Sequence, residues 1–164
     1  MSGTTQNAAS PLGQALGRVP SGLFILTVRH EGRATGMLAS WVMQAGFDPP
    51  MLTVALGVGR YVGDWVAASG GFTLNQVPES NKTLIRHFGR GFDPKAEAFN
   101  GLTVLKKGRV GPVLAGALSY LDAEVACEMA VGDHRVFLAR VVGGEVIDEA
   151  GEPKVHLRKN GFHY

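Results

Sequence analysis

The chain has 164 residues, of which 45% are hydrophobic and 18% are charged, and its formal net charge at pH 7 is +2. This length suits one domain with a sizeable core, and the scattered, nearly balanced charge argues against a nucleic-acid partner. The single cysteine, Cys127, excludes an intramolecular disulfide and a cysteine metal cluster. No stretch approaches 18 apolar residues and the first ten residues lack the apolar core of a signal peptide, so we expect a cytoplasmic protein without a membrane partner.

Residues 1–10 are expected to be disordered, and residues 11–164 are expected to form one domain. The domain opens with a predicted helix over 11–19, because Ser10 suits the N-cap and Pro11 suits the first helical position. The apolar residues of this helix share one face: Leu12, Ala15, Leu16 and Val19.

Strands are expected to make up most of the remaining chain. The strands 22–29 and 34–43 are predicted to form a hairpin, and so are 117–131 and 135–147, which meet at a tight turn. The other strands are expected over 51–56, 72–77, 102–105 and 153–157, with short helices over 61–68 and 80–89. About seven strands with interposed short helices predict a mainly β fold, a closed or split β-barrel, rather than a parallel βαβ fold.

The common catalytic motifs are absent from the sequence. It contains no GxGxxG, GxxxxGK[ST], HExxH or GxSxG pattern, and its five histidines lack close metal-ligand spacing. Demanding chemistry would therefore belong to a bound organic cofactor. The segment 36–41 suits one, because its small residues let a ligand approach the backbone; a buried strand end with Trp41 in the core is the alternative.

Six short segments, in this order along the chain, resemble the flavin reductase-like, FMN-binding split-barrel family. They are residues 18–27, 36–41, 47–50, 71–75, 116–121 and 132–134. The ending, residues 155–164, is most similar to the C-terminal flavin reductase module of cyanobacterial flavodiiron proteins. The resemblance covers residues 12–164 and implies an FMN-binding split barrel with Greek-key topology.

The resemblance also implies a set of site residues. The flavin would be lined by the end of the second predicted strand and the loop after it: Met37, Leu38, Ala39, Ser40, Trp41, Val42 and Gln44. The turn before the predicted helix 61–68 would hold the phosphate at a helix N-terminus, through Leu56, Gly57, Gly59, Arg60 and Tyr61. Asn75 is expected near the ring, and the nicotinamide is expected beside His134, Phe162, His163 and Tyr164. No residue is assigned as catalytic or as a metal ligand.

These residues have plainer interpretations when the resemblance is set aside. Arg60 would be an ordinary loop arginine, His134 an exposed turn residue, and the last four residues a frayed tail. The resemblance favours an oxidoreductase, an NAD(P)H-dependent flavin reductase in which hydride passes from NADH or NADPH to N5 of FMN, or of FAD, and on to an acceptor.

Two alternative functions remain open from the sequence. One is an FMN-binding electron-transfer protein without efficient NAD(P)H turnover, and the other is a small-molecule-binding barrel that holds no flavin. The low charged fraction favours a homodimer, because a charge-poor surface suggests apolar area that a second copy covers. A redox partner protein is a further partner that the resemblance allows.

Overall fold

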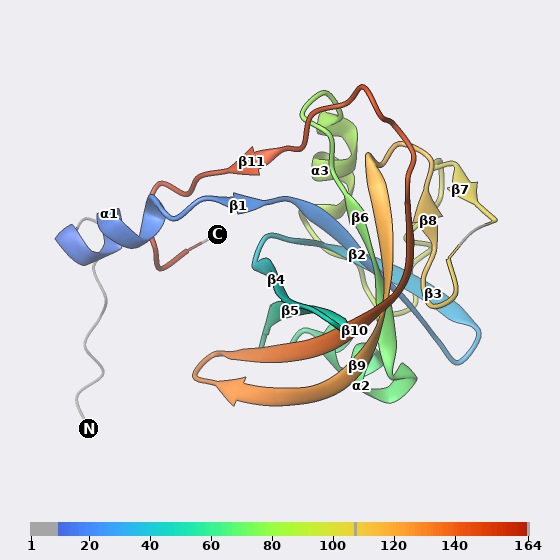
Figure 1. Cartoon of the computed structure of the whole chain (residues 1–164), viewed down its shortest axis with the longest axis horizontal. Helices are drawn as coiled ribbons and strands as arrows, with labels where there is room; N and C mark the ends of the chain where they lie inside the picture. Colours follow the sequence, from blue (N-terminus) through green and yellow to red (C-terminus); the bar gives the residue numbers. More distant parts are fainter. Residues whose placement is uncertain (1–9, 107, 164) are drawn as a thin grey trace.

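Seven antiparallel strands form the main sheet of the computed structural model, which describes residues 10–106 and 108–163 (Figure 1). Their order across the sheet is β3 (Arg33–Ala39), β2 (Phe24–His30), β6 (Gly71–Gln76), β9 (Ser119–Val131), β10 (His134–Val146), β5 (Pro50–Gly57) and β4 (Val42–Phe47). Two short pairs accompany it, β1 (Ser21–Gly22) with β11 (Val155–His156) and β7 (Val104–Leu105) with β8 (Val113–Leu114). The helices are α1 (Pro11–Gly17), α2 (Tyr61–Ser69) and α3 (Lys82–Phe88).

The barrel is split between β3 and β4. These strands are neighbours in the chain but occupy opposite ends of the strand order, so the chain changes sheet edge at Ser40 and Trp41. The backbone N–H of Ala55 donates to the carbonyl oxygen of Trp41 at 3.0 Å and ties the crossing to β5. The mainly β split barrel is confirmed, but the prediction of one strand over 34–43 is wrong, because pairing with β2 ends at Ala39 and pairing with β5 begins at Val42.

Strand β2 is buried on both faces and therefore separates two parts of the core. Leu26 and Val28 face a cluster that contains Val62 and Val66 of α2. The preceding residue, Ile25, faces a second cluster, in which Leu84 and Phe88 of α3 are buried. Successive residues of a strand point to opposite faces, so the two helices are anchored on different sides of the same strand.

Helix α1 lies beside β1, β11 and the C-terminal segment, on an arm that extends away from the barrel (Figure 1). Ser10 caps it as predicted, since its hydroxyl oxygen accepts from the N–H of Gly13 at 3.1 Å. The face buried against the arm is formed by Gly13 and Gly17, and a Cβ on Gly17 would lie only 2.9 Å from the carbonyl oxygen of Arg158. The apolar side chains of the helix are turned toward solvent instead, with Leu12 60% and Leu16 38% exposed, and the helix ends at Gly17, two residues before the predicted end at Val19.

The prediction of disorder over residues 1–10 falls, apart from Ser10, outside the described residues. Within the described ranges, none of the helices combines the length and the apolar composition needed to cross a membrane. The predicted edge strand near the C-terminus is confirmed as β11, but it pairs with β1 on the arm rather than with the main sheet.

Candidate functional site

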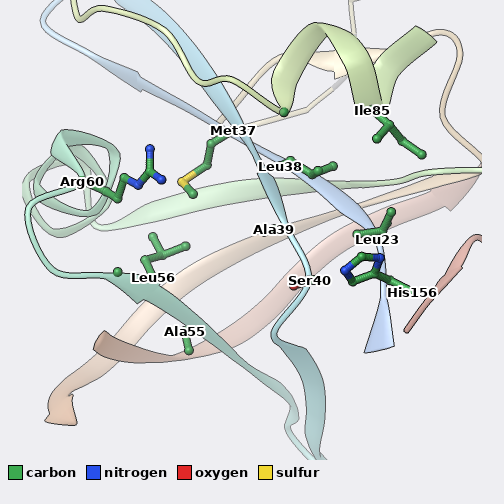
Figure 2. A pocket seen from close by; sticks show the side chains of 12 residues that line it. Leu23, Met37, Leu38, Ala39, Ser40, Ala55, Leu56, Arg60, Ile85 and His156 are labelled. Carbon is green, nitrogen blue, oxygen red and sulfur yellow. The ribbon is translucent and has the colours of Figure 1, made fainter. Parts of the chain in front are cut away.

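A cavity of about 340 Å³, here called the central cavity, lies between β3, the end of β5 and α3 (Figure 2). Figure 2 shows Arg60 beside Met37 at one end of it, and His156 beside Leu23 and Ser40 at the other. The residues that line it are mostly apolar or small: Leu23, Met37, Leu38, Ala39, Ser40, Ala55, Leu56, Gly57, Arg60, Ile85, Gly89 and His156. An apolar slot with polar groups at its ends suits a flat, partly charged organic ligand.

Strand β3 gives this cavity a wall of backbone as well as side chains. Among the strands of the described residues its one neighbour is β2, so its other edge carries backbone N–H and C=O groups outside the ladder. Ala39 on β3 and Ala55 on β5 are small, so a ligand can approach this edge closely. The predicted residues Met37, Leu38, Ala39 and Ser40 are therefore brought together in one place.

The turn between β5 and α2 sets the position of Arg60. The N–H of Val58 donates to the carbonyl oxygen of Asp133 at 2.8 Å, and the N–H of Arg60 donates to that of Gly57 at 3.3 Å. Gly59 between them has φ +82°, a backbone conformation that favours glycine. Arg60 is the N-cap residue of α2 but makes no side-chain cap, so its guanidinium group extends into the cavity.

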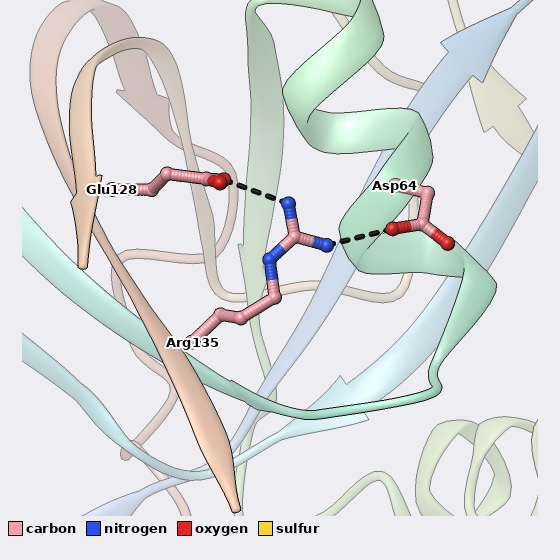
Figure 3. Close-up of polar contacts among 3 residues, drawn as sticks. All are labelled: Asp64, Glu128 and Arg135. Carbon is pink, nitrogen blue, oxygen red and sulfur yellow. Dashed lines mark hydrogen bonds and ion pairs between the residues drawn. The ribbon is translucent and has the colours of Figure 1, made fainter. Parts of the chain in front are cut away.

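Arg135 of β10 fixes α2 against the long hairpin (Figure 3). Its Nη1 lies 2.7 Å from Oδ1 of Asp64 on α2, and its Nη2 lies 2.7 Å from Oε2 of Glu128 on β9. The hydrogen bond to Glu128 is the largest cause that raises the pKa of Arg135 above its ordinary value. This clamp holds the helix whose first turn carries Arg60 and Tyr61.

A second cavity of about 310 Å³, here called the outer cavity, begins where the central cavity ends. The two share Met37 and Arg60, and the outer cavity is lined by Gly36, Met37, Gly59, Arg60, Tyr61, Val62, Arg90, Gly91, Phe92 and Asp93. The hydroxyl groups of Tyr61 and Thr35 are hydrogen-bonded at 2.7 Å, which holds the Tyr61 ring against β3. The predicted residues Gly59 and Tyr61 thus lie beyond Arg60 rather than in the central cavity.

A third cavity of about 190 Å³, here called the tail cavity, brings the predicted nicotinamide residues together. Trp41, Asp133, His134, Arg158, Gly161, Phe162 and His163 line it. The ring centroids of Trp41 and His134 are 4.6 Å apart, and the Arg158 guanidinium carbon lies 5.0 Å from the Trp41 ring centroid. Tyr164, predicted for the same site, lies outside the described residues.

His134 is held firmly for a residue at a hairpin turn. It is 8% exposed, and its Nδ1 lies 2.7 Å from Oδ1 of Asp133. That hydrogen bond lowers the pKa of the Asp133 carboxyl below its ordinary value. A further cavity of about 220 Å³ shares Ser40 with the central cavity and Trp41 with the tail cavity, so it lies between these two sites at the chain crossing.

The family is decided by a match over nearly the whole chain. The model of the flavin reductase like domain matches residues 16–163. The chain belongs to this family. The diflavin flavoprotein A 1 of Synechocystis sp. is 38% identical to it over 156 residues, which make up 94% of this chain and 27% of that protein. The putative diflavin flavoprotein A 6 of Nostoc sp. is 37% identical over 157 residues, 95% of this chain and 28% of that protein.

This flavin reductase-like chain therefore spans little more than a quarter of the length of those curated relatives. Its fold is shared with solved structures. The NADH:FAD oxidoreductase SgcE6 of Streptomyces globisporus C-1027 matches 90% of this chain and 87% of its own, with a TM-score of 0.81 and 22% identity. The styrene monooxygenase flavin reductase of Pseudomonas putida S12 matches 88% of this chain and 90% of its own, with a TM-score of 0.74 and 25% identity.

Asn75 lies outside the lining of all these cavities. Its side chain is fully buried, donates from Nδ2 to the carbonyl oxygen of Pro112 at 3.1 Å, and accepts at Oδ1 from the N–H of Leu114 at 2.8 Å. The neighbouring Thr73 accepts from the N–H of Gly111 at 2.7 Å. In this flavin reductase-like fold Asn75 therefore fastens the loop before β8, which is a structural role.

Two further predicted residues are separated from the central cavity by the split of the barrel. Gln44 lies on β4, beyond the crossing, and lines another cavity of about 340 Å³ together with Val42, Met51 and Leu121. Val42 also lines the small cavity beside Trp41. Their positions follow from the exchange of partner strands after Ala39, which the sequence prediction did not include.

Sequence reasoning missed five residues that line the central cavity, and His156 is the titratable one among them; the others are Leu23, Ala55, Ile85 and Gly89. His156 lies on β11, opposite Ser21 of β1, and its ring reaches the cavity near Leu23 and Ser40 (Figure 2). Burial, followed by the positive charges of Arg158 and Lys154, lowers the pKa of His156 below its ordinary value. The available signal was its place in the predicted edge strand 153–157, where alternate residues face one side.

Proposed function

We propose that this chain is a flavin reductase that uses NADH or NADPH and binds its flavin, FMN or FAD, in the central cavity. The bound flavin would supply the redox chemistry, because its N5 atom accepts hydride and its reduced ring passes electrons to an acceptor. Membership of the flavin reductase-like family supports the proposal, and the central cavity is the observation that carries it.

The chemistry of the cavity wall fits a flavin. Leu56 and Ile85 offer apolar contact for a planar ring system, and the small Ala39 leaves room for it beside β3. The unpaired edge of β3 supplies the backbone donors and acceptors that the polar rim of such a ring needs. Arg60 supplies a permanent positive charge for a phosphate group at the end of the cavity.

The tail cavity suits the nicotinamide, because its residues are already held in place. Trp41 and His134 are in ring contact, and Asp133 fixes the orientation of the imidazole through Nδ1. Phe162 adds a further aromatic wall that helps to exclude water. The proposed contribution of the protein to catalysis is to hold two rings in reactive geometry, which reduces the entropic part of the barrier.

The proposal is tested by binding and turnover together. The chain is saturated with FMN, freed of excess flavin, and assayed for retained flavin absorbance and for steady-state NADH and NADPH oxidation. Retained flavin with rapid oxidation supports the proposal. Retained flavin with slow oxidation identifies an electron-transfer protein instead, and a colourless protein rejects flavin binding altogether.

We further propose that two chains form a two-fold homodimer. Several large apolar side chains on the arm and on β4 are more than half exposed, among them Leu12, Val19, Met43 and Phe47. A stable interface buries about 1,600 Å² in total, and such side chains are its usual core. Light scattering over a dilution series checks the assembly, and a mass of one chain at micromolar concentration contradicts it.

A further inference from the structure

The outer cavity continues the central cavity directly past Arg60. Met37 and Arg60 line both cavities, and Gly89 of the central cavity precedes Arg90 of the outer one in the chain. Nη1 of Arg60 lies 3.7 Å from the place that a Cβ on Gly91 would occupy, so the guanidinium group stands at the junction. A ligand whose phosphate lies at Arg60 can therefore extend into a second space of similar size.

The outer cavity carries two positive charges. Arg60 and Arg90 both line it, and within the described ranges neither guanidinium group is paired with a carboxylate. Asp93 lines the same cavity, and its Oδ1 accepts from the N–H of Lys95 at 2.9 Å. Two arginines without acidic partners at one cavity suit two phosphate groups, which arginine binds through paired hydrogen bonds.

The remaining walls suit a nucleoside. Tyr61 and Phe92 supply half-buried aromatic surface for a purine ring, and the Asp93 carboxylate can accept from ribose hydroxyl groups. Gly91 has φ +71° and, like Gly59, places no side chain in the cavity. The backbone is therefore open to close approach on both sides of the space.

We infer that the flavin of this protein is the dinucleotide FAD, and that the outer cavity holds its adenosine diphosphate end; this rests on the proposed flavin function. NAD(P)H carries the same adenosine diphosphate group. We assign the adenosine diphosphate group in the outer cavity to the flavin, because this cavity adjoins the central cavity. The proposed nicotinamide site lies at the opposite end of segment 36–41.

The test compares three flavins that differ only beyond the ring system. Flavin-free protein is titrated with riboflavin, FMN and FAD by calorimetry, as wild type and as Arg90→Ala. We expect wild type to bind FAD more tightly than FMN. Loss of one charge-assisted contact should weaken FAD binding about tenfold in Arg90→Ala, while FMN and riboflavin binding change by less than about twofold.

Arg86→Ala is the matched control, because Arg86 is an exposed arginine of α3 that lines neither cavity. It should leave FAD affinity unchanged. Equal weakening of FMN and FAD in Arg90→Ala, or unchanged FAD binding, overturns the inference. Weaker binding of ADP-ribose to FMN-loaded Arg90→Ala, with FAD binding unchanged, would show that the outer cavity binds the nicotinamide dinucleotide. That result also overturns the inference. Failure of the wild type to bind any flavin rejects the proposed function itself.

Discussion

Replacing Arg60 by alanine should separate the phosphate of the flavin from its ring system. Arg60 lines the end of the central cavity and makes no side-chain cap on α2, so the substitution removes a charge without removing a structural contact of the helix. A hydrogen bond to a charged group is worth about 1.5–3 kcal/mol. Because the Arg60 side chain is exposed, the lower end of this energy range applies. It corresponds to about a tenfold loss in FMN affinity.

Riboflavin is the internal reference for this prediction, because it has the same ring system and no phosphate. Its affinity for Arg60→Ala should stay within about twofold of wild type, since the apolar walls are untouched. Arg33→Ala, at the exposed start of β3, controls for the change in net charge. Fluorescence titrations of all three proteins with both ligands measure the difference, and equal losses for FMN and riboflavin would refute a phosphate contact at Arg60.

Further substitutions test three other parts of the structure. His134→Ala should raise the KM for NADH severalfold and leave the flavin content intact, because His134 lines the tail cavity and not the central one; a colourless variant would contradict this. Arg135→Leu should lower the free energy of unfolding by about 1–2 kcal/mol, since it breaks two ion pairs on a mostly buried side chain. Arg140→Ala, which breaks one exposed pair, should cost less than about 0.5 kcal/mol, and equal losses in urea unfolding would argue against the clamp. The pKa of His156 lies below its ordinary value of 6.5, so the unfolded chain takes up the proton first and stability falls as the pH drops below 6.5. His156→Gln should lose less stability over that range, and an identical pH profile would count against a lowered pKa of His156.

The elements that the sequence predicts well are those specified by local patterns. The hairpin of β9 and β10 follows from two long alternating runs around a tight turn at Gly132, which has φ +56°. The N-cap at Ser10 follows from its residue type and from the proline after it. Each of these depends on residues close together in the chain, where sequence patterns carry most information.

The errors arise where distant segments decide the structure. Residues 34–43 look like one strand because nothing local marks the change of partner from β2 to β5 at Ser40. The apolar stripe of α1 is real, but which face is buried depends on contact with Gly161, whose N–H donates to the carbonyl oxygen of Gly13 at 2.7 Å. A pattern with a period of 3.6 residues finds the stripe and cannot show what covers it.

The same distinction applies to the site. The resemblance predicted Met37 to Ser40 and Arg60, and the structure places these residues around the central cavity, whereas His156 arrives from the other end of the chain. The resemblance also implied that Asn75 lies near the ring. Its hydrogen bonds to Pro112 and to Leu114 of β8 show another reason for burying an amide, which is to satisfy buried backbone groups.

The position of the site follows from the split in the barrel. In a closed barrel β3 would pair with β4, the backbone groups at that edge would be used in the ladder, and side chains would fill the interior. Here the chain leaves β3 at Ser40 and crosses to the far edge, so an unpaired edge and a space beside it remain. The small residues of segment 36–41 keep that space open, and Trp41 at the crossing joins it to the tail cavity. The feature that breaks the regular sheet is thus the one that creates room for a ligand.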